Sequence, residues 1–417
     1  MREMKDSGIS WVGEIPKEWS VNRAKYCFVN TKEIAGCMSD RYERLALTMN
    51  GVIKRSKDDS NGLQPEKFET YQILRPDELV FKLIDLQNVS TSRVGLSPYL
   101  GLVSPAYIIL KSNKRVLPAF AEKYFLMLWK NQIFNALGDA GVRSNLNSKD
   151  LLELSIPFPT FDEQQQIADF LDRECGKIDG LKADIQAQID TLEHYKRSVV
   201  TEAVTLGLNP SAPMKDSGIP WVGQFPTHWT KKKGKYILRY MSKPVKQDDG
   251  VITCFRDGEV TLRSNRREDG FTMADKEIGY QGVDVGDLVV HGMDGFAGAI
   301  GISDSRGKAS PVLNVLNTKQ NKKYIMYYLR SMAYGEVFTA LSTGIRVRSC
   351  DLRWNKLAEL LYPLPPIDEQ NNIVSYIDNQ IARTNEIIAD KKSQIETLDG
   401  YKKSLIYEYV TGKKEVV

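Results

Sequence analysis

The chain contains one sixteen-residue segment twice, half a chain apart. It reads MKDSGISWVGEIPKEW at Met4–Trp19 and MKDSGIPWVGQFPTHW at Met214–Trp229, with eleven of sixteen positions identical at an offset of 210. Both copies are rich in glycine, proline and tryptophan, which specify turns and large apolar anchors. A duplication of this length constrains the fold more than any single motif, because it requires one structural unit to be built twice.

Further matches continue the repeat along the chain. YQILRPDELVFKLID at Tyr71 aligns with YQGVDVGDLVVHGMD at Tyr280, and PFPTFDEQQQI at Pro157 aligns with PLPPIDEQNNI at Pro363. The offset stays between 210 and 204. The two halves are therefore predicted to share one fold with small insertions.

Each half begins with a strand-rich part, at about 20–158 and about 230–365. Short runs of β-branched and apolar residues such as AYIILK and DLVVHGM, broken by glycine, asparagine, aspartate and proline, predict strands. An apolar helical stretch follows in each half. We therefore expect a duplicated α/β (α+β) globule of roughly 140 residues, which is a normal size for a domain.

A long helix is predicted after each globule, behind the proline-marked segments PFPTFDEQ and PLPPIDEQ. Apolar residues recur every seven positions in both helices, which is typical of a coiled coil. Each helix is about 43 residues or roughly 60 Å long, and the chain reverses between the halves, which favours antiparallel pairing. The predicted seam consists of Leu171, Ile178, Ile185, Leu192 and Val199 in the first helix and of Ile381, Ile388, Ile395, Leu398 and Leu405 in the second, with Ile167, Leu181 and Tyr195 in a neighbouring column.

These elements divide the chain into four predicted parts related by an internal pseudo-twofold repeat. Residues 1–158 hold the first repeated segment and the first globule, and residues 159–208 hold the first long helix. Residues 209–365 hold a linker, the second repeated segment and the second globule, and residues 366–417 hold the second long helix.

Composition and motifs argue against catalysis on this chain. The formal net charge is only +4, and the five cysteines include no C-x-x-C pair, which indicates reduced thiols in a cytoplasmic protein. The sequence has no apolar run long enough to span a membrane, no histidine with a neighbour at metal-ligand spacing, and no P-loop or nucleophile elbow. We expect a positioning protein that carries no metal or cofactor, not an enzyme.

Basic residues gather in loop-like segments at matching places of both halves. Arginine and asparagine pair with guanine and adenine edges, and loops on a rigid scaffold often carry recognition residues. A solvated surface is the alternative for any one of these residues, but their repeated placement favours DNA binding. The candidate DNA-binding residues are Lys54, Arg55, Lys57, Lys82, Arg143, Asn145, Asn147 and Lys149 in the first half and Arg256, Arg263, Arg266, Arg267, His291, Arg346, Arg348 and Arg353 in the second.

The duplicated DSGI-[SP]-WVG-x-[IF]-P-x-x-W segment, the P-x-P…DEQ entry into each long helix and the strand-rich part before it resemble the specificity subunit of type I restriction–modification enzymes. The resemblance covers essentially the whole chain. It implies two target-recognition domains, each reading one half of a split double-stranded DNA target, held apart by the antiparallel helices. It also implies a non-catalytic subunit. Two methyltransferase subunits would bring S-adenosylmethionine, and motor–nuclease subunits would bring ATP and magnesium.

On this resemblance, the two repeated segments would create two equivalent docking surfaces for the methyltransferase subunits. Their tryptophans, Trp11, Trp19, Trp221 and Trp229, are therefore candidate subunit-docking residues, with packing in the core as the alternative. Two other classes of function stay open. A standalone DNA-binding regulator would bind a specific sequence without a methyltransferase, and a helical scaffold would show no salt-dependent DNA binding at all.

Overall fold

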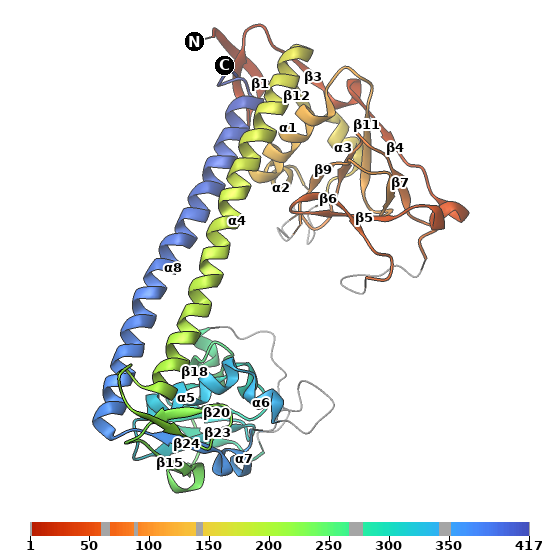
Figure 1. The fold of residues 1–417 in the computed structure, drawn as a ribbon. Coiled ribbons are helices and arrows are strands. Elements are labelled where there is room, and N and C mark those ends of the chain that lie inside the picture. The colour runs from red at the N-terminus through yellow and green to blue at the C-terminus, as the bar shows by residue number, and fades with distance from the viewer. Residues whose placement is uncertain are drawn as a thin grey trace. The chain divides into compact units, whose positions relative to one another are not determined.

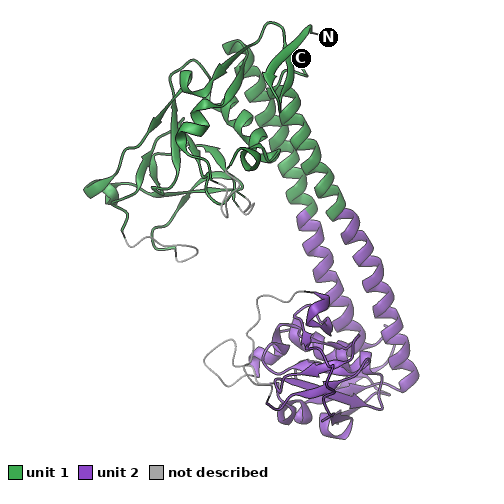
Figure 2. Cartoon of the chain, turned by 180° about the vertical axis from the view of Figure 1, so that it is seen from behind, with its two compact units in different colours: residues 1–185, 392–417 green, residues 186–391 purple. Residues whose placement is uncertain are grey.

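A computed structural model of the 417-residue chain describes residues 2–59, 67–86, 91–138, 145–266, 278–341 and 352–416. The chain divides into two compact units, one of residues 1–185 with 392–417 and one of residues 186–391. Figure 2 shows that each unit contains a stretch of both long helices. Each unit is therefore completed by a helical segment that belongs to the other half of the sequence repeat.

The first unit contains a small hairpin, a strand pair and two four-stranded sheets (Figure 1). The hairpin is β1–β2, the pair is β3–β12, and the sheets have the orders β6-β5-β10-β7 and β4-β11-β8-β9. Three short helices, α1, α2 and α3, lie between β11 and β12 in sequence. The bounds are β1 (Met4–Ile9), β2 (Gly13–Pro16), β3 (Ser20–Arg23), β4 (Phe28–Thr31), β5 (Arg44–Thr48), β6 (Gly51–Arg55), β7 (Gln72–Leu74), β8 (Leu79–Phe81), β9 (Val94–Leu96), β10 (Gly101–Val103), β11 (Ile108–Ser112), α1 (Pro118–Lys130), α2 (Ile133–Leu137), α3 (Ser148–Glu153) and β12 (Ser155–Phe158).

The second unit repeats this arrangement strand for strand, which confirms the duplicated α/β fold predicted from the sequence. The hairpin β13–β14, the pair β15–β24 and the sheet β16-β23-β20-β21 have direct counterparts in the first unit. The pairs β17–β18 and β19–β22 match the remaining sheet, with the parallel contact reduced to a bridge between Val251 and Lys308. The bounds are β13 (Met214–Asp216), β14 (Gln224–Pro226), β15 (Thr230–Lys233), β16 (Leu238–Tyr240), β17 (Ile252–Cys254), β18 (Val260–Leu262), β19 (Gln281–Val283), β20 (Leu288–His291), β21 (Ile300–Ile302), β22 (Gly307–Ala309), β23 (Leu313–Thr318), α5 (Lys322–Tyr334), α6 (Val337–Ala340), α7 (Trp354–Glu359) and β24 (Leu361–Leu364).

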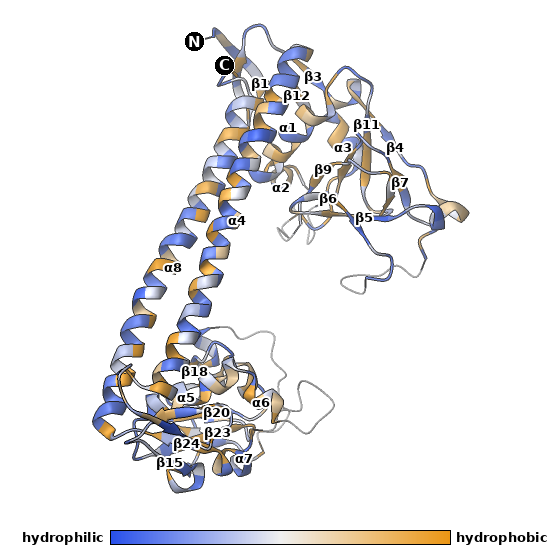
Figure 3. Ribbon diagram, in the orientation of Figure 1, coloured by the Kyte–Doolittle hydropathy of each residue, from blue (hydrophilic) through white to orange (hydrophobic). Residues whose placement is uncertain are grey.

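The long helices α4 (Phe161–Leu206) and α8 (Ile367–Val410) run antiparallel, as predicted. In the first unit Lys182 Nζ donates to Asp399 Oδ1 at 2.5 Å, and in the second unit Lys196 Nζ donates to Asn385 Oδ1 at 2.8 Å. Residue numbers therefore fall along α8 as they rise along α4. Apolar residues recur along both helices between polar ones (Figure 3), which is the pattern that a paired helix needs.

Burial along the helix pair is strongest near the cores of the two units. Two members of the predicted neighbouring column, Leu181 and Tyr195, are instead 52% and 47% exposed, so that part of the prediction is wrong. Ile189 is buried in α4, because a helix with 3.6 residues per turn drifts from a strict seven-residue repeat. Of the predicted seam, Leu171, Ile178, Val199, Ile388 and Leu405 are buried, and Ile185, Leu192, Ile381, Ile395 and Leu398 are half-buried.

Each unit has an apolar core to which both helices contribute. In the first unit Leu171 of α4 and Leu405 of α8 join the same cluster as Phe125 of α1. In the second unit Val204 of α4 and Ile377 of α8 join the cluster around α5. The start of each long helix thus packs in its own unit, and its end completes the core of the other.

An ion network in the second unit ties Arg306 to the loop before β17. Arg306 donates from Nε and Nη2 to the two carboxylate oxygens of Asp249 at 3.0 and 2.8 Å, and it also contacts Asp284. The hydrogen bonds from Arg306 lower the pKa of Asp249 to about 2. Because the usual value is near 4, this pair stabilises the folded unit above about pH 4 and loses its contribution as the pH falls toward the folded pKa.

We therefore expect Asp249→Asn to flatten the acid limb of the stability curve. The free energy of unfolding, measured by urea titration between about pH 5 and about pH 2, should fall less steeply in the variant than in the parent. Asp304→Asn, which removes an exposed carboxylate of the same unit, is the matched control and should keep the parental slope. An Asp249→Asn curve parallel to that of the parent would contradict this assignment.

Candidate nucleic-acid interface

The basic residues of the first unit surround the β5–β6 hairpin and line a cavity of about 580 Å³. Acidic partners hold two of them in place: Lys54 Nζ lies 2.6 Å from Glu43 Oε2, and Arg55 Nε donates to Asp59 Oδ2 at 2.6 Å. The hydrogen bond with Glu43 and its negative charge raise the pKa of Lys54. The basic residues that line this cavity are Arg41, Arg44, Lys54, Arg55 and Lys57.

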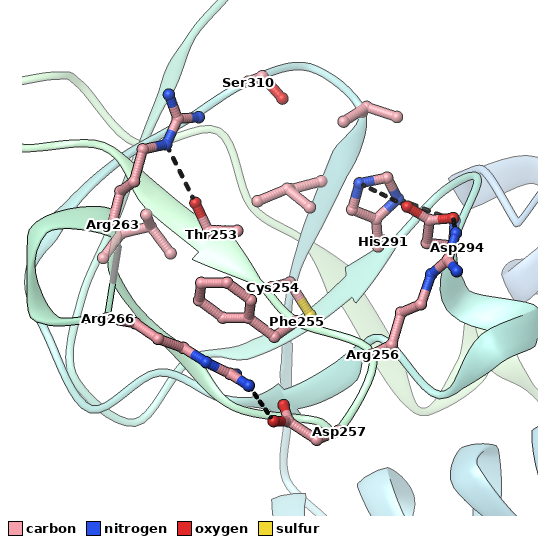
Figure 4. A pocket seen from close by; sticks show the side chains of 13 residues that line it. Thr253, Cys254, Phe255, Arg256, Asp257, Arg263, Arg266, His291, Asp294 and Ser310 are labelled. Atoms are coloured by element: carbon pink, nitrogen blue, oxygen red, sulfur yellow. Dashed lines mark hydrogen bonds and ion pairs between the residues drawn. The ribbon is translucent and has the colours of Figure 1, made fainter. Parts of the chain in front are cut away.

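In the second unit the equivalent hairpin, β17–β18, borders a cavity of about 510 Å³ (Figure 4). Arg256 Nη2 donates to Asp294 Oδ1 at 2.9 Å, and Arg266 Nη2 lies 2.7 Å from Asp257 Oδ2. The hairpin aligns with β5–β6 in the sequence repeat, so the two hairpins are equivalent, and the first cavity includes Arg55 while the second includes the aligned Arg263. Four of the predicted residues line this second cavity together: Arg256, Arg263, Arg266 and His291.

His291, at the end of β20, has one defined tautomer. Its Nδ1 accepts hydrogen bonds from the backbone N–H groups of Met293 at 3.2 Å and Asp294 at 2.9 Å. A ring nitrogen that accepts carries no proton, so the proton of the neutral imidazole lies on Nε2. Burial lowers the pKa of His291, with the charge of Asp294 opposing. The side chain therefore presents a neutral N–H donor and fixes the turn that carries Asp294.

The loop between the two hairpin strands differs between the units. Only residues 49–50 separate β5 from β6, whereas residues 255–259 separate β17 from β18. A hydrogen bond from Phe255 N to Glu259 O at 2.8 Å closes the longer loop, and the Arg266 guanidinium lies 4.2 Å from the centroid of the Phe255 ring. The extra residues place Arg256 beside the cavity of the second unit.

Lys82 lies at the position in the first unit that His291 takes in the second. It follows β8 and is half-buried, and its Nζ donates to Thr91 Oγ1 at 3.4 Å. Burial and the charge of the nearby Arg93 lower the pKa of Lys82. Asp85, three residues later, matches Asp294 in the same way, so both units keep a polar residue and an aspartate at this turn.

The predicted residues before α3 have structural roles in the first unit. Asn145 Oδ1 accepts a hydrogen bond from Asp85 N at 3.1 Å. Asn147 caps α3, because its Oδ1 accepts from the backbone N–H groups of Lys149 at 2.8 Å and Asp150 at 3.1 Å. The amide oxygen of Asn147 is thus used within the protein, while Lys149 is exposed on the first turn.

Four of the predicted DNA-binding residues, Arg143, Arg267, Arg346 and Arg348, lie outside the described residues. Arg353 is described and is the N-cap residue of α7. A side chain added at Gly292 would come within 3.8 Å of Arg353 Cγ, so Arg353 lies beside the turn that carries His291 and Asp294. The arginine therefore belongs to the same region as the second cavity.

A further cavity of about 700 Å³ lies in the second unit between the helix pair and the α5 region. Arg256 and Asp257 line it as well as the β17–β18 cavity, so the two hollows share one wall. Lys196, Arg197 and Arg330 also line it. Glu193, Asp257 and Glu336 line it too, so this second hollow carries charges of both signs between the hairpin and α4.

Trp19 and Trp229, predicted as docking residues, lie in the cores of the two units at 1% and 0% exposure. Trp19 Nε1 donates to Glu163 Oε2 at 2.9 Å, and Trp229 Nε1 donates to Glu369 Oε1 at 3.0 Å. The docking prediction is wrong for these two, because a buried side chain presents no surface to a partner. They instead fix each repeated segment to the first turn of a long helix.

Trp11 and Trp221 are half-buried, and their role in docking stays a prediction. Trp11 Nε1 donates to Tyr124 Oη at 3.1 Å, and Trp221 Nε1 donates to Tyr328 Oη at 2.9 Å. These bonds join the turn of each β1–β2 or β13–β14 hairpin to α1 or α5. The tyrosine partners occupy matching places in the two units, although the sequence comparison did not single them out.

The glutamine of each DEQ motif has the same structural role in both units. Gln164 Oε1 accepts from Leu117 N at 2.7 Å, just before α1, and Gln370 Oε1 accepts from Asn321 N at 3.0 Å, just before α5. Both glutamines are buried. The motif therefore fixes the first turn of α4 to the start of α1, and the first turn of α8 to the start of α5.

The end of each long helix meets the tryptophan of the other half's repeated segment. Gly207 follows α4 and Gly412 lies just beyond α8, with φ of +77° and +71°. A side chain at these positions would come within 3.1 Å of the Trp229 ring and 3.0 Å of the Trp19 ring. Glycine is required at both positions because a side chain would meet the tryptophan ring. The positive φ is also unfavourable for other residues.

The described residues contain no group of three or more histidine, cysteine, aspartate or glutamate side chains arranged to hold a metal ion. Within the same part of the chain, no helix is long and apolar enough to cross a membrane. Cys27, Cys175 and Cys254 are buried and Cys37 is exposed, and all four are free thiols.

Comparisons with known proteins connect this architecture to one family. Residues 84–191 match the model of the type I restriction modification DNA specificity domain. A protein of Methanocaldococcus jannaschii, provisionally named the type I restriction enzyme MjaX specificity subunit, is 22% identical over 452 residues, which cover 97% of this chain and 96% of the relative.

Two solved structures resemble the chain over nearly its whole length. One, from a study of complex assembly and conformational transition of the type I R-M system, has a TM-score of 0.66 at 11% identity and covers 96% of this chain and 99% of that chain. The other is the crystal structure of the HsdS subunit from Thermoanaerobacter tengcongensis. It has a TM-score of 0.47 at 13% identity and covers 96% of this chain and 98% of that chain. The first of these likenesses shows the fold.

Proposed function

Because this chain carries the type I restriction–modification DNA specificity domain and the fold that goes with it, we propose that it is the DNA specificity subunit of such a system. One observation carries the proposal. The β5–β6 and β17–β18 hairpins lie at equivalent places in two like units, and each borders a cavity lined with lysine or arginine. Each unit then reads one half of a split target in double-stranded DNA.

The partners follow from the same assignment. Two methyltransferase subunits bind the repeated segments, with Trp11 and Trp221 as the partly exposed candidates for contact. They supply S-adenosylmethionine and the methylation chemistry, and motor–nuclease subunits supply ATP hydrolysis and cleavage with magnesium. This chain selects the site and performs no covalent step. Its free thiols suit the reducing cytoplasm, where we propose that the complex works.

The division of labour between the units is tested by one substitution in each. Arg55→Ala and Arg263→Ala remove equivalent arginines of the two hairpins. In a complex reconstituted with its methyltransferase, each variant should relax or weaken recognition of one half-site only, at a cost of about 1–3 kcal/mol for a lost base contact. Sequencing of methylated sites from a randomised DNA library measures both half-sites at once.

A suitable control is Arg23→Ala, which removes an exposed arginine that pairs with Glu153 away from either hairpin. It should leave both half-sites unchanged. A contact with phosphate would instead weaken all sequences alike and lower the salt dependence by about one unit of slope. If either hairpin variant changed both half-sites equally, the model of two independent reading units would be wrong.

A further inference from the structure

The Arg256–Asp294 pair is an exposed ion pair on the cavity of the second unit and joins two separate elements. Arg256 lies in the β17–β18 loop and Asp294 in the turn after β20, and their side chains are 58% and 33% exposed. The hydrogen bond of 2.9 Å joins Arg256 Nη2 to Asp294 Oδ1. A guanidinium has five N–H donors and a carboxylate has two oxygens, so both groups keep capacity to bind a ligand (Figure 4).

The charges around this cavity favour a neutral ligand over a phosphate. Arg256 is bound to Asp294, and Arg266 is bound to both Asp257 and Glu259. Acidic side chains thus neutralise much of the positive charge at the cavity. A phosphate bound in the cavity would lie near the carboxylates as well as the guanidinium groups. Its negative charge and those of the carboxylates would repel one another. A neutral group with hydrogen-bond acceptors and donors meets no such cost.

The donors and acceptors of the pair match one base-pair edge. In the major groove a G·C pair presents the acceptors N7 and O6 of guanine beside the N4 amino donor of cytosine. Arginine donates to N7 and O6, and an aspartate oxygen accepts from N4. Arg256 and Asp294 place such a donor group and such an acceptor side by side, held by direct contact.

The turn that carries Asp294 is itself fixed. His291 Nδ1 accepts from the backbone N–H groups of Met293 and Asp294. Its Nε2 lies 3.9 Å from Asp294 Oδ2. A side chain held in this way loses little conformational entropy when it binds a base, which favours specific recognition.

We propose that Arg256 and Asp294 together read one G·C base pair in the half-site of the second unit, Arg256 contacting guanine and Asp294 contacting cytosine. This inference rests on the proposed function, since it names the base pair that one recognition unit selects. In the first unit the corresponding loop holds only Met49 and Asn50. The first unit therefore reads its own half-site by other contacts.

Two variants in the reconstituted methyltransferase complex test the proposal. With a randomised-site DNA library, Arg256→Ala should reduce the preference for G·C at one position of one half-site by about 5- to 150-fold. Asp294→Asn should reduce the preference at the same position, because the amide no longer offers the two carboxylate acceptors to cytosine N4. Arg256→Lys keeps the charge without the planar fork and should also lose part of this preference.

Asp294→Asn separates base reading from phosphate binding. If the cavity bound phosphate, removing a negative charge would strengthen methylation of all sequences and steepen the salt dependence. That result would overturn the proposal, as would an unchanged G·C preference in the Arg256 variants. Arg173→Ala is the matched control, because Arg173 is 61% exposed and bonds Glu174 at 2.9 Å on α4, and it should leave all base preferences unchanged.

The outcomes also separate this inference from the proposed function. If the parental complex methylates no preferred sequence, the assignment as a specificity subunit fails. If the parent is specific and both variants fold with parental melting temperatures but keep the G·C preference, only the reading by Arg256 and Asp294 is wrong.

Discussion

Replacing Trp229 by alanine is expected to lower the free energy of unfolding of the second unit by about 3–5 kcal/mol. The ring is fully buried, lies 6.1 Å from the Phe225 ring between centroids and packs against Gly207 at the end of α4. The substitution opens a cavity and removes the indole N–H from Glu369. Urea denaturation followed by circular dichroism measures the loss.

Trp229→Phe separates the two contributions. It removes the hydrogen bond to Glu369 together with a smaller part of the packing than alanine does, so we expect a smaller loss of about 1–3 kcal/mol. Trp19→Ala should repeat the alanine result in the first unit, where the ring packs against Gly412. Alanine variants as stable as the parent would show that the tryptophans do not hold the repeated segments to the helices.

Ile388→Glu should destabilise the helix pair by about 3–5 kcal/mol, the cost of an uncompensated charge in a buried position. Ile388 is 5% exposed on α8, in the stretch that pairs with α4 within the second unit. The glutamate carboxylate must either lose its hydration on burial or force the two helices apart. Thermal and urea unfolding, monitored by circular dichroism, measure the effect.

The adjacent residue gives a matched control, because Ile387 is 47% exposed on the same turn of α8. Ile387→Glu introduces the same charge with the same change of side chain and should alter stability by less than about 0.5 kcal/mol. Equal destabilisation by both substitutions would mean that the seam does not face the other helix at Ile388.

The repeat allowed the fold to be predicted from the sequence in considerable detail. The proline-marked DEQ segments fall at the first turns of α4 and α8, and the aligned runs become matching strands such as β8 and β20. These features are local, since a helix start and an apolar strand depend on residues close in sequence. The likeness of the two halves then predicted that both units share one fold, while the strand order within each sheet was not predicted.

Long-range contacts were less predictable. The tryptophans were predicted to face a partner, but Trp19 and Trp229 are buried because the end of the opposite helix reaches them at Gly412 and Gly207. The contact of Gly412 with Trp19 joins the two ends of the chain, and neither this contact nor that of Gly207 with Trp229 leaves a periodic signal in the sequence. The heptad pattern similarly placed Tyr195 near the seam, whereas the actual helical drift exposes it.

The basic residues were predicted by type, but their acidic partners were not. Arg256, Arg263 and His291 come together at one cavity, as a shared role in binding requires. Asp257 and Asp294 also line it, and no sequence pattern singles out these two among the many acids of the chain. Only the five-residue loop of β17–β18, which the first unit lacks, brings Arg256 to Asp294.

The methylation pattern of the unmodified complex tests the central claim most directly. The purified chain, assembled with its methyltransferase and given S-adenosylmethionine and a randomised DNA library, should methylate sites with two short specified sequences separated by an unspecified gap. Each specified sequence corresponds to one of the two units. A single continuous motif, or methylation without sequence preference by a complex that assembles fully, would contradict the account.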